Sequence, residues 1–171
     1  FRSAAMLKGL GSLSYGELAG ERMKLGLMLH DPEEEHDCFS DNTHNSHYYD
    51  QVGMMNVYLG RYKRVDGSQV KGPSLSDLVR ERDERLDEEV RAKLDATLAA
   101  MQAMRERAET VETYDMMIAE GNAEGNAVVQ AVIDRLVDQT RSFERVIALL
   151  ELGSIELEGS DSLDNPQTVF Q

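Results

Sequence analysis

The residues that can bind a cation or move a proton are concentrated in one stretch, from Asp31 to Asp50. All four histidines and the only cysteine of the 171-residue chain fall in or beside it. Neutral imidazole and carboxylate together suit iron, zinc or manganese, and two histidines with one carboxylate leave coordination positions open on iron. His36, His44 and Asp41 could supply that set. The spacing is not specific, because the stretch contains neither the HExxH sequence of a zinc protease nor a CxxC pair.

The same stretch also holds two potential nucleophiles. Cys38 could pair with a neighbouring histidine, although the surrounding carboxylates disfavour its thiolate. Ser40 could complete a triad with a histidine and an aspartate, but the GxSxG sequence is absent. A third interpretation is that the stretch carries no chemical function. Histidines in an exposed acidic loop are often only solvated, and Asp41, Asn42 and Thr43 could simply cap the next helix.

The elements that position this stretch are predicted to be helices. Residues 30–50 themselves are expected to form a polar loop, because their Pro, Asp and Asn favour turns and their apolar residues show no sustained period. Before them, apolar residues recur every three to four positions over residues 2–29, which predicts a long helix bent at its glycines. Glu17 and Glu21 lie one turn apart on it, with Arg22 beside them. They form either a solvated patch or part of the same site as the loop.

The rest of the chain is predicted to be mostly helical. Ser74 and Asp77 have the spacing of a capping box and mark the start of a helix. The remaining segments expected are a short buried helix over 50–62, an exposed loop over 63–73, one helix of about 50 Å over 83–119, and another over 127–152. Two long helices joined by a short turn must be antiparallel neighbours. We therefore expect an all-α fold of long antiparallel helices over residues 1–153, followed by a polar tail over 154–171.

Charge and composition exclude several classes of partner. The net charge of −14 at pH 7 argues against nucleic acid and against an anionic membrane surface as partners. Binding to either begins with the attraction of basic residues to phosphate groups. No apolar run approaches the roughly 20 residues of a membrane span, so no such span is expected in this segment. A single cysteine cannot form an internal disulfide. The chain begins at Phe1 directly before the first helix, so we expect the native start to lie outside this sequence.

A longer sequence motif indicates a protein family. The string EHDCFSDNTH, from Glu35 to His44, resembles the EHxCFSDNTH segment of the imelysin-like family, also called iron-regulated protein A-like proteins. In that family the segment follows a helix carrying ExxxER, which residues 17–22 match here. Downstream, GMMNVYLGRY over residues 53–62 is similar to the family's GxxNVYxGxY. The resemblance covers roughly residues 7–150.

The resemblance implies a fold, a compartment and a role. Members are all-helical and built from two bundle-like halves related by an approximate twofold axis, with an iron site between the halves. They are exported to the periplasm or held at the outer membrane, and they are associated with iron uptake. The GxHxxE motif of the first half is absent from these 171 residues, so the chain resembles the second half alone. The implied partners are the GxHxxE-bearing half and other iron-uptake proteins of the envelope.

These observations define the expected site. The metal or ligand is expected to bind Glu35, His36, Asp41 and His44, with iron as the metal in preference to zinc. The residues expected to line the site are Glu17, Glu21, Arg22, Cys38, Ser40, Asn42, Thr43 and Asn56. The expected function is a binding protein of iron uptake. The rival is a metallopeptidase in which Glu21 or Glu35 is the general base for a metal-bound water. A third reading is an interaction module whose loop binds nothing.

Overall fold

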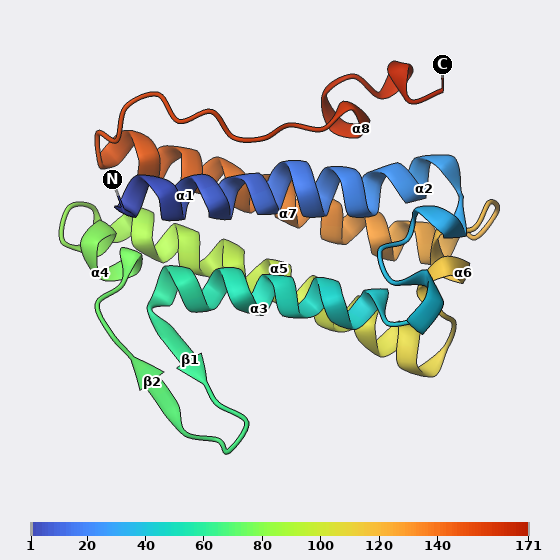
Figure 1. Ribbon diagram of the computed structural model, residues 1–171, viewed down its shortest axis with the longest axis horizontal. Coiled ribbons are helices and arrows are strands. Elements are labelled where there is room, and N and C mark those ends of the chain that lie inside the picture. Colours follow the sequence, from blue (N-terminus) through green and yellow to red (C-terminus); the bar gives the residue numbers. More distant parts are fainter. Residues whose placement is uncertain (1, 171) are drawn as a thin grey trace.

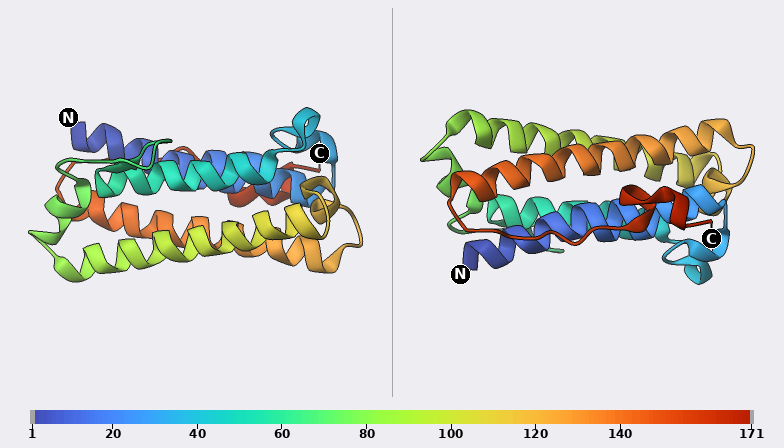
Figure 2. Two further views of the ribbon diagram at one scale, coloured as in Figure 1. Left: turned by 90° about the horizontal axis from the view of Figure 1, so that it is seen from below. Right: turned by 90° about the horizontal axis from the view of Figure 1, so that it is seen from above.

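Four long helical segments lie side by side along the molecule (Figure 1). The structure is a computed structural model and describes residues 2–170. The first segment consists of α1 (Arg2–Ser12), the π-helix η1 (Leu13–Lys24) and α2 (Leu25–Leu29), and the others are α3 (Thr43–Leu59), α5 (Glu84–Thr110) and α7 (Ala123–Leu149). Each segment runs antiparallel to the one before it, as Figures 1 and 2 show. The predicted all-α class of long antiparallel helices is confirmed.

Most of the short elements lie at the two ends of this bundle (Figure 1). One end, which we call the loop end, carries residues 30–42 and α6 (Tyr114–Ile118). Residues 30–42, called the site loop below, contain the 3-10 turns η2 (Pro32–Glu34) and η3 (Cys38–Ser40). The opposite end carries the antiparallel hairpin of β1 (Arg61–Lys63) and β2 (Gln69–Lys71), and α4 (Leu75–Arg80). The last short elements are α8 (Asp161–Asp164) and the 3-10 turn η4 (Pro166–Thr168).

The hydrophobic core lies between the four segments and is built from residues at helical spacing. Leu94 of α5 and Ile133 of α7 are at most 1% exposed, and burial of such a side chain contributes about 1.5–3 kcal/mol. Methionines fill much of the remaining space, and six of them are buried: Met23, Met54, Met55, Met101, Met104 and Met117. Within residues 2–170, no helix combines the length and the hydropathy that crossing a membrane requires.

A layer of buried polar side chains crosses this core and joins all four segments. Gln51 of α3 donates to the carbonyl oxygen of Leu94 in α5 at 3.0 Å. Gln51 and Gln139 of α7 exchange two amide hydrogen bonds of 3.0 Å each. Gln139 also donates to the hydroxyl of Ser14 in η1 at 2.9 Å, and that hydroxyl donates to the carbonyl oxygen of Leu136. A shift of any helix would leave these groups unpaired, so the layer fixes how the helices face one another.

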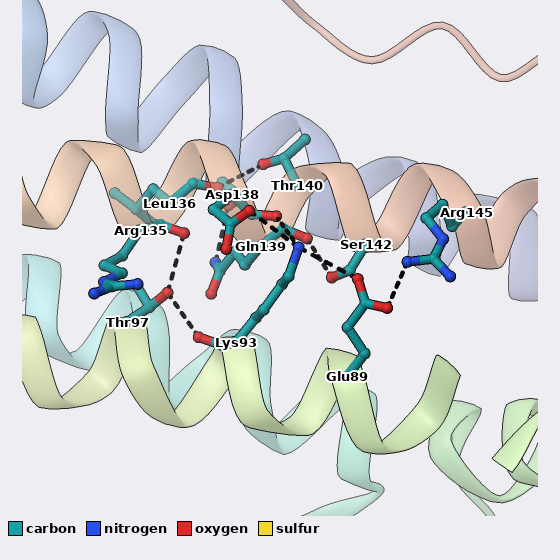
Figure 3. A network of polar contacts seen from close by, with 11 residues as sticks. Glu89, Lys93, Thr97, Arg135, Leu136, Asp138, Gln139, Thr140, Ser142 and Arg145 are labelled. Carbon is teal, nitrogen blue, oxygen red and sulfur yellow. Dashed lines mark hydrogen bonds and ion pairs between the residues drawn. The ribbon is translucent and has the colours of Figure 1, made fainter. Parts of the chain in front are cut away.

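Ion pairs continue the contact between α5 and α7 (Figure 3). Lys93 of α5 lies 3.0 Å from the carboxylate of Asp138 in α7 and 3.3 Å from that of Glu89. Glu89 in turn pairs with Arg145 of α7. These groups are partly exposed, so each pair contributes at most about 1 kcal/mol. Together they lie along the seam that makes α5 and α7 antiparallel neighbours, as predicted.

The tail after α7 runs back along the outside of the first helix (Figure 2). The backbone N–H of Glu158 donates to the hydroxyl of Ser12 at 3.0 Å, and the hydroxyl of Ser162 donates to the carbonyl oxygen of Gly20 at 3.0 Å. Gly16 gives the tail room, because a Cβ there would lie 2.5 Å from the carbonyl oxygen of Glu158. The interior glycines, which predicted only a bend, therefore let the tail approach the helix closely.

Several predicted boundaries are wrong. The loop expected over residues 30–50 ends at Asn42, because residues 43–50 belong to α3. The helix expected over 50–62 is the rest of α3 and ends at Leu59, where Gly60 takes a left-handed conformation with φ of 58°. The exposed segment expected over 63–73 contains the strand β2 and pairs with β1 in a hairpin.

The helix expected over residues 83–119 is interrupted after Thr110. Glu112 explains the interruption, because its carboxylate accepts hydrogen bonds from Arg107 at 2.6 Å and from Asn122 at 2.8 Å. These contacts hold the turn between α5 and α6. The last long helix begins at Ala123 instead of residue 127, since Asn122 caps it by accepting from the N–H of Gly125.

Candidate functional site

The site loop is tied to the bundle at both of its ends. His30 closes the first helix in a left-handed conformation, and its Nδ1 donates to the carbonyl oxygen of Ile118 in α6 at 2.7 Å. At the other end, the N–H of Asp37 donates to Oγ1 of the buried Thr43 at 3.0 Å. The carboxylate of Asp37 accepts from the hydroxyl of Ser46 in α3. The loop is thereby fixed against α3 and α6, and both helices contribute to what lies beneath it.

Four buried polar residues at the loop end form the candidate site, which we call the His47 cluster. They are Glu35 of the site loop, His44 and His47 of α3, and Tyr114 of α6. Their exposed fractions are 6%, 8%, 0% and 1% respectively. The rings of His47 and Tyr114 meet edge to face with 5.7 Å between centroids, and the exposed His36 stacks on His47 at 6.3 Å.

Five side-chain polar atoms of the cluster are buried without a hydrogen-bond partner. They are Oε2 of Glu35, Nδ1 of His44, both ring nitrogens of His47 and the hydroxyl of Tyr114. Among the side chains of residues 2–170, no other buried polar atom is in this position. Buried polar groups in folded proteins are paired in the great majority of cases. The concentration of all five at one place therefore separates the loop end from the rest of the bundle.

Burial sets the charge of these groups. It lowers the pKa of His47 to about 3, and the positive charges of Arg22 and His36 act in the same direction. It raises the pKa of Glu35, and the negative charge of Asp115 adds to this, while the hydrogen bond from Thr43 opposes it. It also raises the pKa of Tyr114, with a smaller contribution from the charge of Glu35. At neutral pH the imidazole of His47 and the phenol are both uncharged.

The hydrogen bonds of His44 define its tautomer. The amide nitrogen of Asn45 donates to Oδ1 of Asn42 at 2.9 Å and lies 3.0 Å from Nε2 of His44. Because that amide nitrogen is a donor, Nε2 is the acceptor and the neutral ring carries its proton on Nδ1. The cluster therefore offers N–H or O–H donors at His44, His47 and Tyr114. Its acceptors are Glu35 and the second nitrogen of His47.

The structure brings part of the predicted site together. Glu35 and His44 lie in the cluster and His36 lies at its edge. Arg22 of the first helix pairs with Glu17 at 3.6 Å and with Asp50 of α3 at 3.1 Å. Because its charge lowers the pKa of His47, Arg22 lies within electrostatic reach of the cluster. Of the predicted lining residues, Thr43 is fully buried beside Glu35.

Other predicted residues lie elsewhere. Glu21 contacts the tail, where its carboxylate accepts from the hydroxyl of Ser160 at 2.5 Å. Asn56 lies in α3 about 20 Å along the helix axis from Thr43, near the hairpin. Asp41 is exposed with φ of 48°, and Ser40 donates to the carbonyl oxygen of Asp37. Cys38 is half-buried in η3, and Asn42 bonds to Asn45.

His47 and Tyr114 are the members that the sequence did not predict. A signal for His47 exists, because the polar residues Thr43, His44, His47 and Gln51 recur at the spacing of one helical face and lead directly into Met54. A search for apolar periodicity does not detect a buried face that is polar. Tyr114 carries no such signal, since it reaches the cluster from a distant part of the chain through the turn after α5.

Metal ligation depends on how many donors converge. Within residues 2–170, no three His, Cys, Asp or Glu side chains are grouped so that they could hold a metal ion. His36, Asp41 and His44 therefore do not form such a group by themselves. In this tautomer of His44, the proton is on Nδ1, the nitrogen without a partner, so Nδ1 is a hydrogen-bond donor. Binding of a metal by these residues stays a prediction.

The chain is similar to a known protein family. A family model described as Imelysin matches residues 2–143, which is most of the chain and includes the site loop, α3 and α6. No curated protein matches the sequence.

Proposed function

The chain belongs to the imelysin family, and from that premise we propose that it is a metal- or ligand-binding protein associated with iron uptake, in the periplasm or at the outer membrane. The family provides the biological setting of this proposal, and the His47 cluster provides its chemistry. The observation that carries it is the group of five buried polar atoms without partners at the loop end.

Buried polar atoms without partners lower the stability of the fold unless a ligand binds them. Each buried donor or acceptor without a partner costs about 1–3 kcal/mol, because it has lost its hydrogen bonds to water. A bound ion or small polar molecule that contacts several of these atoms returns part of that cost. The cluster presents donors and acceptors together, so a ligand that both accepts and donates hydrogen bonds matches it.

We propose iron as the metal, in preference to zinc. The imidazole of His47, the carboxylate of Glu35 and the phenol of Tyr114 combine nitrogen and hard oxygen donors, which suit iron, whereas zinc sites more often use cysteine and histidine. His47 is already neutral at pH 7, so it has no proton to lose before ligation. A cation near Glu35 would favour its ionised form against the burial that raises its pKa.

We also propose a partner, the GxHxxE-bearing half of an imelysin-type protein. Because no three-ligand group forms within residues 2–170, further donors would have to come from another source. An apolar groove of about 350 Å³ between α1 and α3 supports the presence of a neighbour. Met6, Tyr49 and Val57 line this groove and are 39%, 59% and 42% exposed. Asp50 lines it as well and bonds to Arg22, so the groove leads towards the cluster.

Calorimetric titration with ferrous iron, under anaerobic conditions, tests the proposal. Replacing a group that orients a ligand typically weakens metal affinity about 10-fold to 100-fold, and we expect at least this loss for His47→Phe and for Glu35→Gln. The matched control is Asp95→Asn, which removes an exposed carboxylate from α5. A protein that contains both halves should bind iron more tightly than this segment. Equal affinities for the wild type and both cluster variants would refute the proposal.

A further inference from the structure

The hairpin of β1 and β2 stands apart from the packing of the bundle. It projects from the end of α3 away from the helices (Figure 1). All six strand residues are exposed, and none belongs to the hydrophobic core. The identity of its side chains is therefore not dictated by the fold, and their chemistry indicates what the hairpin contacts.

Residues 61–71 are basic in a chain that is strongly acidic. They hold four of the 18 Lys and Arg residues, Arg61, Lys63, Arg64 and Lys71, and one of the 32 Asp and Glu residues, so they carry a charge of +3 while the whole chain carries −14. Their one carboxylate, Asp66, is bonded to the N–H and hydroxyl of Ser68. Within residues 2–170, none of the four cations takes part in a salt bridge.

The strand register gathers three of these cations, Arg61, Lys63 and Lys71, on one face, and Arg64 lies in the connecting turn. Arg61 lies directly opposite Lys71, and Lys63 lies opposite Gln69. Like charges that face each other across a strand pair destabilise it, so this arrangement costs stability unless an anion lies against it. A hollow of about 250 Å³ lies beside the cations and is lined by Arg61, Tyr62, Lys63 and Gln69 of the hairpin and by Asn56 of α3.

Apolar side chains lie on the other face of the hairpin, and one lies at its tip between Arg64 and Asp66. Tyr62 lies opposite Val70, and the two are 53% and 43% exposed. Val65 in the connecting turn is completely exposed. The hairpin is thus a thin ribbon with cations on one face, apolar groups on the other and an apolar residue at its tip. A folded protein partner would cover only one face of the hairpin. A soft interface into which the tip inserts would contact both faces at once.

We propose that the hairpin docks this protein on an anionic phospholipid surface, with its cations on lipid phosphates and Val65 and Tyr62 at the boundary with the acyl chains. Tyrosine favours this interface, and each Lys or Arg near an anionic surface adds to binding. The net charge of the chain argued against such a surface, but the charge is unevenly distributed. Strands of three residues span about 10 Å, slightly more than the Debye length of about 8 Å at physiological salt, so salt partly screens the repulsion between the acidic bundle and the surface.

Flotation with phospholipid vesicles tests this proposal, using phosphatidylcholine alone and phosphatidylcholine with phosphatidylglycerol in equal parts. We expect binding to the mixed vesicles alone, and weaker binding as salt is raised. Lys63→Gln combined with Arg64→Gln should weaken binding about 30-fold, or about fivefold for each cation lost. The matched control, Arg135→Gln with Arg141→Gln, removes two exposed cations from α7 and should bind like the wild type.

A second measurement follows the tip directly. The chain has no tryptophan, so Val65→Trp introduces a single fluorophore at the hairpin turn. Its emission should shift to shorter wavelength with the mixed vesicles and not with phosphatidylcholine alone. Failure of the wild type to float with anionic vesicles, or an equal loss in the α7 control, would overturn the proposal. An unshifted emission of the bound Val65→Trp protein would also contradict it, because the tip would then remain in water.

Discussion

The imidazole of His47 meets the ring of Tyr114 edge to face, 5.7 Å between centroids, and no polar atom of either ring has a hydrogen-bond partner. Both side chains are almost completely buried. The contact satisfies the two rings as apolar surfaces but leaves their polar atoms unsatisfied. Substitutions of these two residues can therefore change ligand affinity without lowering the stability of the fold.

Tyr114→Phe should leave the free energy of unfolding unchanged or raise it, by up to about 1–3 kcal/mol, because it removes a buried hydroxyl that has no partner. Tyr58→Phe is the matched control. Its hydroxyl donates to the buried carboxylate of Asp87 at 2.9 Å, so this variant should lose about 1–3 kcal/mol. Urea denaturation of both variants measures the difference. Equal destabilisation by the two substitutions would show that the hydroxyl of Tyr114 is paired in solution.

Acid should destabilise the fold through His47. Its pKa falls from 6.5 to about 3 on burial, so between these values the unfolded chain takes up a proton that the folded chain excludes. The free energy of unfolding should therefore decrease as the pH is lowered from about 6.5 towards 3, by up to about 1.4 kcal/mol per pH unit from this group. The measurement is urea denaturation at a series of pH values.

The control for this pH dependence is His47→Phe. Glu35 and Asp50 act with the opposite sign, because burial raises their pKa values and the folded state keeps their protons to higher pH. Their contribution is present at low pH and is lost as the pH rises. It remains in the variant, so the difference between the two proteins isolates His47. Identical pH dependence in both would mean that His47 is accessible to protons in the folded state.

Gly16→Ala should destabilise the protein, because the new Cβ would lie 2.5 Å from the carbonyl oxygen of Glu158 and push the tail from the first helix. Gly9→Ala is the control on the same helix. It meets nothing within 4 Å and should stabilise by about 0.5–1 kcal/mol through helix propensity. Thermal unfolding compares the two. If Gly16→Ala is as stable as Gly9→Ala, the tail does not dock where the structure has it.

Metal-dependent peptidase activity should be absent. A hydrolase needs a base beside a metal-bound water, and Glu21, one of the two bases considered, bonds to Ser160 of the tail. The iron-loaded protein with both halves should therefore cleave unfolded protein substrates no faster than its Glu35→Gln variant. Cleavage that a chelator abolishes, that added metal restores and that Glu35→Gln eliminates would instead favour the enzymatic reading.

The sequence predicted the parts of this fold that depend on local signals. The apolar period of residues 2–29 gave the extent of the first helical segment. The hydroxyl of Ser74 accepts from the N–H of Asp77 at 2.9 Å, as the capping-box spacing indicated. The helix α4 begins at Leu75, directly after Ser74. Both features depend on residues within one or two turns of each other. The chain encodes them without reference to the rest of the structure.

The parts that were missed depend on contacts between distant residues. The start of α3 lacks the apolar period of a helix because its buried residues Thr43, His44 and His47 are polar, and His47 packs against Tyr114, which lies in another helix. The helical spacing of Glu17 and Glu21 predicts both in the site, but Glu21 instead bonds to Ser160 of the tail. Tyr114 joined the cluster only because α5 stops where Glu112 meets Arg107 and Asn122.

The docking of the tail on the first helix has a consequence for biosynthesis. Ser12 bonds to Glu158, and Ser14 bonds to Leu136, so the first segment finds these partners only when nearly all of the chain has been made. The contact between α3 and α5 needs far less of the chain and can form earlier. During synthesis the first helical segment therefore remains without these partners until α7 and the tail have left the ribosome.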